Sequence, residues 1–511
     1  MAETADVVET VKQGYAFEGA AIELGALLAG DEPKPEAPVR IPLSMVNRHG
    51  LVAGATGTGK TKTLQLMAEQ LSAAGVSVFA ADIKGDLSGI SQPGQESEKL
   101  LARTKTIGQE WTATGFPTEF YALGGQGTGI PVRATITSFG PVLLSKVLGL
   151  NDVQESSLGL IFHYADKQGL TLLDLKDLRA VITHLTSDEG KADLKELGGL
   201  SAATAGVILR SLIGFADQGA DAFFGEPEFD TADLMQQRDG KGVISLLELP
   251  NLQDRPALFS TFLMWLLADL FHDLPEVGDV DKPKLVFFFD EAHLLFDDAS
   301  KAFRDSIAQT VRLIRSKGVG VFFVTQTPKD VPDEVLAQLG SRVQHQLRAH
   351  TPNDAKALRA TVSTFPSSSY DLEEVLTQLG IGEAIVTVMN EKGAPTPVAW
   401  TRLRAPQSLM APATAEQLTA SVQASPNNAK YTEVIDRESA YEKLAAKVQA
   451  GAEAAEAEEQ ARQAPEPKPR PRKQDKSMVE QVIGSSAFKQ FARSAGREIV
   501  RGLFGAARRR R

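Results

Sequence analysis

The sequence predicts an α/β fold in which a mostly parallel β-sheet carries helices on both faces, with a helical insertion and a helical basic C-terminal tail. Five short apolar runs are continuous rather than alternating, which is typical of strands buried on both faces. Helix-like segments separate several of these runs, and this alternation favours a doubly wound core. The runs are residues 51–53, 76–82, 242–249, 284–291 and 318–326, and the helix-like segments include 60–74, 253–274 and 299–316.

Composition and charge narrow the classes of function. The chain has 511 residues and no cysteine, which excludes disulfides and thiolate metal sites. The net charge is −11, but residues 464–511 alone carry 13 basic and 4 acidic residues. An acidic body with a basic tail is not typical of a DNA-coating protein, so any contact with a polyanion should be local. The longest apolar stretch, 258–271, is too short to span a bilayer and contains Asp269, and the acidic N-terminus is unlike a signal peptide. We therefore expect a cytoplasmic protein.

Changes in pattern suggest five parts. They are a short N-terminal segment (1–48), a core (49–138 and 241–404), a mainly helical insertion (139–240), a helix with a charged Pro-rich linker (405–476), and a basic amphipathic helix (477–511).

A glycine-rich loop follows the first apolar run. Gly54, Gly59, Lys60 and Thr61 stand in the order G-x-x-x-x-G-K-T. Small residues let successive backbone N–H groups surround a phosphate, and the N-terminus of the following helix adds its dipole. Lys60 is expected to reach the β- and γ-phosphates, and the Thr61 hydroxyl is expected to bind Mg²⁺. The predicted nucleotide-binding residues are Gly54, Ala55, Thr56, Gly57, Thr58, Gly59, Lys60, Thr61 and Lys62.

Two further apolar runs end in polar residues. Asp290 and Glu291 follow "LVFFF", and we expect Asp290 to hold Mg²⁺ and Glu291 to polarise the attacking water. Gln326 ends the next run, at the edge where ligands lie in an open parallel sheet. There it is expected to sense the γ-phosphate or the water; alternatively it only forms the turn before Thr327 and Pro328.

Arginines and a lysine complete the candidate residues. Arg315 and Arg342 each either stabilise transition-state charge from a neighbouring subunit or make ordinary surface ion pairs. The segment "ADIKGD" places Asp82, Lys84 and Asp86 after the second run, where a contact with nucleotide or nucleic acid is expected.

Together these motifs resemble a known family. The segments "GATGTGKT", "DIKGDLSG", "FFFDEAH" and "VGVFFVTQTPKDVPDEVL" are similar to the HerA/FtsK branch of RecA-like P-loop ATPases, and more closely to the bacterial HerA-like, YjgR-type family. The resemblance covers roughly residues 40–500. It implies a RecA-like core, a hexameric ring, ATP and Mg²⁺ between subunits, and DNA threaded through the centre. It also implies that Asp290 and Glu291 are the Walker B pair, Gln326 is the sensor and Arg315 acts in trans.

The basic tail has helical periodicity. Apolar residues recur every fourth position and basic residues do the same on the far side of the helix. The apolar set is Ala487, Phe491, Ala495, Ile499 and Leu503, and the basic set is Lys489, Arg493, Arg497 and Arg501. The tail could dock on the acidic body or a neighbouring subunit, contact nucleic acid, or lie on a membrane surface.

Three functions are consistent with these motifs. The leading hypothesis is an ATP-hydrolysing ring that moves nucleic acid as a translocase or helicase-like motor. The alternative is an ATP-switched oligomeric scaffold that recruits a protein partner, such as a nuclease, without translocating DNA. A P-loop kinase is disfavoured because Glu291 would activate water, and a kinase does not need a water-activating residue.

Overall fold

The computed structural model describes residues 2–194, 198–249, 256–296 and 301–463. Two units form within this part of the chain. The first contains residues up to 155 and 210–435, and the second contains 156–209 and the described residues from 436 onward.

The first unit is built on a large sheet, which has twelve strands within the described residues. In spatial order they are β2 (Glu32–Pro42), β1 (Ala21–Ala29), β14 (Ala399–Leu403), β13 (Glu383–Thr387), β12 (Ser341–Gln344), β3 (Gly50–Ala53), β11 (Val319–Thr325), β10 (Leu285–Phe289), β4 (Ser77–Asp82), β9 (Ile244–Glu248), β5 (Thr118–Leu123) and β6 (Ile130–Val132). Neighbours from β12 to β6 are parallel, whereas β13, β14, β1 and β2 pair antiparallel. Strands β7 (Gln237–Arg238) and β8 (Lys241–Gly242), of two residues each, form a separate antiparallel pair.

Helices cover both faces of the parallel region, as the sequence predicted. Strands β4, β9, β10 and β11 are buried at every position. On one face Leu64, Met67 and Leu71 of α2 (Lys60–Ala73) join the buried core with Phe288. On the other face Phe79 lies between Phe287 and Phe262 of α10 (Pro256–Asp273), with ring centroids 5.1 and 6.4 Å away.

Of the other helices of the first unit, α11 (Lys301–Ile314) matches a helix predicted at 299–316. The rest are α1 (Ala2–Gly14), α3 (Glu98–Thr106), α4 (Ile136–Phe139), α5 (Pro141–Val147), α12 (Asp333–Leu336), α13 (Pro352–Val362), α14 (Leu372–Gln378), α15 (Ala415–Ala424) and α16 (Pro426–Thr432).

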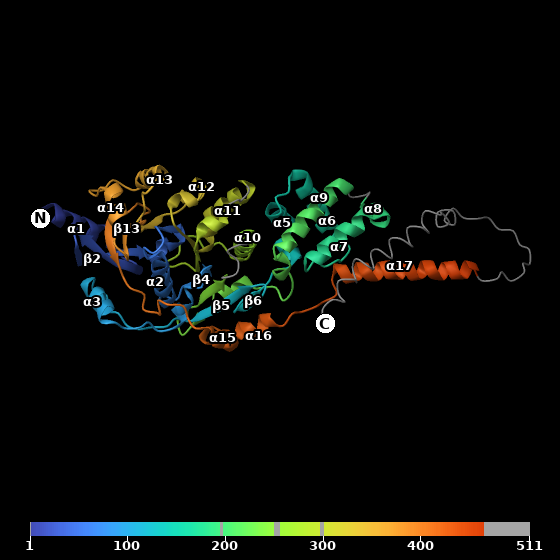
Figure 1. The fold of residues 1–511 in the computed structure, drawn as a ribbon, viewed down its shortest axis with the longest axis horizontal. Helices are drawn as coiled ribbons and strands as arrows, with labels where there is room; N and C mark the ends of the chain where they lie inside the picture. The colour runs from blue at the N-terminus through green and yellow to red at the C-terminus, as the bar shows by residue number, and fades with distance from the viewer. Residues whose placement is uncertain (1, 195–197, 250–255, 297–300, 464–511) are drawn as a thin grey trace, which may run out of the picture. The chain divides into compact units, whose positions relative to one another are not determined.

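The N-terminal segment contributes more regular structure than the sequence suggested. Strands β1 and β2 form an antiparallel hairpin, and β1 pairs with β14 through Gly25 and Leu403. Gly25 is needed there because an added Cβ would lie 2.1 Å from the carbonyl oxygen of Arg402. In Figure 1 the dark blue β2 and the orange β13 lie on the same side of this unit, so segments far apart in the sequence complete the sheet.

Helices dominate between β6 and β9, where the sequence predicted an insertion. They include α6 (Asp152–Lys167), α7 (Leu175–Thr186), α8 (Asp188–Leu194) and α9 (Ala202–Asp217), and the boundaries of the two units fall within α6 and α9. The second unit also contains α17 (Ala440–Gln463), whose start packs on α7 through hydrogen bonds from the Tyr441 N–H and Ser439 hydroxyl to Asp177.

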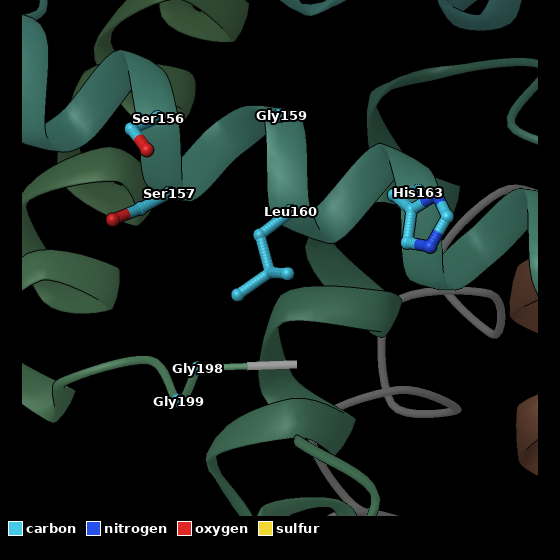
Figure 2. Close-up of a pocket in the computed structure, with 7 residues that line it drawn as sticks. All are labelled: Ser156, Ser157, Gly159, Leu160, His163, Gly198 and Gly199. Atoms are coloured by element: carbon cyan, nitrogen blue, oxygen red, sulfur yellow. The ribbon is translucent and has the colours of Figure 1, made fainter. Parts of the chain in front are cut away.

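A groove of about 450 Å³ opens along α6 in the second unit. Figure 2 shows Leu160 and His163 on the helix, across from Gly198 and Gly199. Among its described lining residues His163 is the one titratable group, so the groove lacks the charged groups of a nucleotide site.

None of the described helices combines the length and apolarity needed to cross a membrane. The Pro-rich linker from residue 464 and the predicted basic helix at 477–511 lie outside the described residues.

Candidate nucleotide-binding site

Four predicted segments meet at one edge of the sheet. The glycine-rich loop follows β3, Gln326 follows β11, Asp290 and Glu291 follow β10, and Asp82 ends β4. These strands are parallel and adjacent in the order β3, β11, β10, β4. Their carboxyl ends therefore lie side by side, and we call this side of the sheet the carboxyl edge.

The phosphate loop (residues 54–61) is held open by glycines and by its neighbours. Gly57 and Gly59 have φ values of 83° and 111°, which glycine adopts without strain. A Cβ on Gly54 would lie 2.4 Å from the Cβ of His345. The loop is fixed from outside by hydrogen bonds from the Ala55 N–H to the Gln346 carbonyl (2.8 Å) and from the Gly382 N–H to the Thr58 carbonyl (3.2 Å). The backbone thus keeps a shape suited to surrounding a phosphate.

Two lysines of the loop and helix point to different groups. Lys60 Nζ donates to the carbonyl oxygens of Gly54 (2.6 Å) and Ala55 (3.2 Å), so its ammonium lies over the loop. Burial lowers the pKa of Lys60, although Glu291 and Asp290 oppose this shift. Lys62 Nζ instead donates to the carbonyl oxygen of Met410 at 2.6 Å. In this conformation the Lys62 ammonium therefore lies outside the phosphate loop, against the carbonyl oxygen of Met410.

A buried histidine, His345, packs against the phosphate loop and α2, a contact that the sequence did not predict. His345 is fully buried, and its Nε2 lies 2.9 Å from the Thr63 hydroxyl on α2. The backbone N–H of His345 donates to the Ala53 carbonyl oxygen at 2.7 Å. Burial and nearby Lys60 lower the pKa of His345 to about 4, so the imidazole is neutral at pH 7. A lone histidine in "VQHQL" carries no local signal for such a contact.

The acidic pair after β10 is almost completely buried. Asp290 is 3% and Glu291 5% exposed. Burial, followed by the charge of Glu291, raises the pKa of Asp290 to about 7. Burial would also raise the pKa of Glu291, but Lys84, His293 and Lys60 outweigh it and lower that pKa. Two carboxyls in sequence therefore differ in proton affinity, the pattern expected where one of them must stay ionised.

A magnesium ion fits this set of donors. Asp290 Oδ1 accepts a hydrogen bond from the Glu291 N–H at 2.9 Å, whereas the buried Oδ2 has no hydrogen-bond partner among the described residues. The described residues contain no group of three or more His, Asp or Glu arranged to hold a metal ion. One carboxylate and the Thr61 hydroxyl are what Mg²⁺ needs when phosphate oxygens and water supply its other ligands.

The remaining candidates occupy three different positions. Gln326 lies exposed at the carboxyl edge, next to the buried Thr325. Arg315 precedes β11, at the opposite end of the strands, where its guanidinium lies 3.7 Å from Asp279. Arg342 sits within β12, where it hydrogen-bonds Thr364 and lies over the ring of Phe365. The structure therefore brings Gln326, but not the two arginines, to the phosphate loop of the same chain.

A match to a protein-family model shows to which family this chain belongs. Residues 28–511 match the model of the helicase HerA-like C-terminal family. The chain belongs to this family. This confirms the resemblance drawn from the sequence motifs, and membership identifies the chain as a HerA-like ATPase.

Named relatives point the same way. The chain is 22% identical over 378 residues to the DNA double-strand break repair helicase HerA of Sulfurisphaera tokodaii, covering 72% of this chain and 67% of the relative. It is 23% identical over 388 residues to the HerA of Saccharolobus solfataricus, covering 74% and 68%. Among solved structures, the plasmid coupling protein TrwB in complex with a non-hydrolysable ATP analogue aligns with a TM-score of 0.53 and 16% identity, over 80% of this chain and 95% of TrwB. That likeness is one of fold, and it confirms the predicted RecA-like α/β core.

Proposed function

We propose that this HerA-like ATPase is a DNA-translocating motor that works as a homo-oligomeric, hexameric ring. One observation carries the proposal: a phosphate loop and an acidic pair with separated proton affinities share one edge of the sheet, while Arg315 lies at the other edge. The relatives named as DNA-repair helicases support DNA as the polymer. TrwB structures with an ATP analogue and with ADP and Mg²⁺ support these cofactors.

The residues of the carboxyl edge divide the chemistry between them. The phosphate loop and Lys60 would bind the triphosphate, and Thr61 with Asp290 would hold Mg²⁺, which supplies charge neutralisation between the phosphates. Glu291 would take a proton from the attacking water. As the water oxygen bonds to the γ-phosphorus, the bond to the bridging oxygen breaks, and ADP and phosphate result.

Two residues would link hydrolysis to movement. Gln326, exposed beside the loop, would contact the γ-phosphate or the water and signal their loss. Arg315 would stabilise the transition-state charge in the neighbouring subunit, because it lies at the far end of its own strands. Arg342 is the second candidate for this role, although its contacts with Thr364 and Phe365 hold it on its own subunit.

A motor of this kind would work in the cytoplasm, beside DNA. The alternative, a scaffold switched by ATP that recruits a protein such as a nuclease, shares the same nucleotide site. It differs in one measurable respect, because its hydrolysis should be indifferent to DNA.

Steady-state ATP hydrolysis tests the proposal. The wild-type chain would be assayed with and without duplex and single-stranded DNA, at low and moderate salt, with the mass of the assembly measured in parallel. Stimulation by DNA that fades with salt is expected, since phosphate contacts release counterions. A hydrolysis rate unmoved by either DNA would overturn translocation and favour the scaffold. A monomeric mass under turnover conditions would overturn the ring.

A further inference from the structure

The turn after β4 is built by a buried aspartate. Asp82 is fully buried, and its carboxylate accepts hydrogen bonds from the N–H groups of Gly85 (2.7 Å), Asp86 (3.2 Å) and Leu87 (2.8 Å). Gly85 has a φ of 71°, which closes the turn without strain. Three hydrogen bonds to one side chain fix the path of the backbone through residue 84.

This turn directs Lys84 to the acidic pair. Strands β4 and β10 are neighbours, with Ala81 opposite Phe289, so the segments that follow them lie together. Lys84 Nζ forms an ion pair with Glu291 Oε1. The Glu291 side chain is 7% exposed and the Lys84 side chain 43%, so the pair reaches from the buried site to solvent. The negative charges of Asp290 and Asp86 also act to raise the pKa of Lys84.

The backbone of Glu291 also adopts an uncommon conformation. Its φ is 47°, in the left-handed region that a residue with a side chain adopts only when its surroundings hold it there. Within the site, Glu291 Oε2 is buried and has no hydrogen-bond partner among the described residues; it lies 3.3 Å from His293 Nδ1. Oε1 is therefore held by the ion pair with Lys84, whereas Oε2 has His293 nearby but accepts no hydrogen bond from the described residues.

We propose that Lys84 is a positioning residue for hydrolysis: it holds Oε1 of Glu291 so that Oε2 faces the attacking water. The inference rests on the proposed function, because it assigns Lys84 a task in the same site. Restricting a catalytic carboxylate to one orientation removes the need to order it during the reaction, and small misplacements of reacting groups are costly. The ammonium of Lys84 thus acts on the base rather than on the nucleotide.

Substitutions at residue 84 separate this task from nucleotide binding. In Lys84→Met we expect kcat for ATP to fall about tenfold or more while KM stays within about twofold, since a misplaced base weakens the chemical step but not phosphate binding. Lys84→Arg keeps a cation within reach of Glu291 and should recover most of the lost kcat. Lys105→Met, a change of an exposed lysine on α3, is the matched control and should behave as wild type.

A second measurement does not depend on turnover. Lys84→Met and Glu291→Gln would be combined, and the urea midpoint of unfolding measured for all four chains. If the two side chains form the ion pair, the effect of Lys84→Met should largely disappear in the Glu291→Gln background. Equal effects in both backgrounds would overturn the contact.

The outcomes distinguish the two proposals. An unchanged kcat in Lys84→Met, a rise in KM alone, or no recovery in Lys84→Arg would overturn the role of Lys84 and leave the proposed function standing. A wild-type chain that hydrolyses no ATP, with or without DNA, would overturn the proposed function and the role of Lys84 with it.

Discussion

The two ends of the parallel strands carry opposite chemistry. At the carboxyl edge the acidic groups gather: Asp290, Glu291, Asp82 and Glu248 end or follow neighbouring strands and are buried. At the other end, which we call the amino edge, Arg48 and Arg315 both lie near Asp279, at 3.5 and 3.7 Å. One chain thus presents acids and a phosphate loop on one side and arginines on the other.

The distance between the edges gives this contrast its meaning. Strand β11 has seven residues, and at about 3.3 Å per residue it separates Arg315 from Gln326 by roughly 23 Å. An arginine side chain cannot span that length. A site that needs both edges would therefore need two copies of the chain, and this requirement can be tested directly.

The largest effect is expected at the carboxyl edge. Glu291→Gln should lower kcat about 10²- to 10⁴-fold, the range typical for loss of a general base, and leave ATP binding intact because the phosphate loop is untouched. Fluorescent-nucleotide binding and ATP turnover, measured on the same preparation, check both parts. Turnover near the wild-type rate would show that another group activates the water.

A mixing experiment tests whether the edges cooperate between copies. Lys60→Ala and Arg315→Ala should each be nearly inactive. Equal mixing should restore turnover, because about a quarter of the interfaces in a mixed ring would pair an intact phosphate loop with an intact arginine. Arg304→Ala, an exposed arginine on α11, is the control and should be fully active alone. Failure of the mixture to recover, once exchange of subunits is shown by mass, would place Arg315 outside the reaction.

The amino edge should matter for stability as well. His49 is 2% exposed, and its Nδ1 accepts a hydrogen bond from the Val321 N–H at 3.0 Å. Burial, aided by the nearby charges of Arg315 and Arg48, lowers the pKa of His49 to about 4. Removing the acceptor leaves a buried N–H unpaired, so His49→Ala should reduce the free energy of unfolding by about 2 kcal/mol. Urea denaturation measures this loss, and an unchanged midpoint would show that water or another group replaces the imidazole.

A dependence of stability on pH is expected from the acids of the carboxyl edge. Burial, followed by the charges of Asp82 and Asp86, raises the pKa of Glu248 to about 8. A carboxyl whose folded pKa is raised stabilises the fold at low pH, and this contribution is lost as the pH rises from the ordinary pKa of about 4.5 to the folded pKa of about 8. Wild-type stability should therefore fall between about pH 4.5 and pH 8, and Glu248→Gln should flatten that fall. Unfolding midpoints across this range provide the measurement; parallel curves for both chains would mean that Glu248 does not cause the fall.

Local sequence determined the parts of the site that depend on near neighbours in the chain. The spacing of Gly54, Gly59 and Lys60 specifies a loop and a helix start within eight residues, and the apolar run before Asp290 specifies a buried strand ending in acids. Continuous apolar runs likewise predicted the parallel core. Each of these signals is complete within one segment.

Only the tertiary structure decided which segments meet. Lys84 and Glu291 are 207 positions apart, and His345 reaches Thr63 across 282. Whether such groups touch depends on the order and register of strands, which a single segment does not encode. The pairing of β1 with β14 was missed for the same reason, because the neighbour of an edge strand lies far away in the sequence. The sequence thus supplied the chemistry of each strand end, and the sheet decided which of those ends act together.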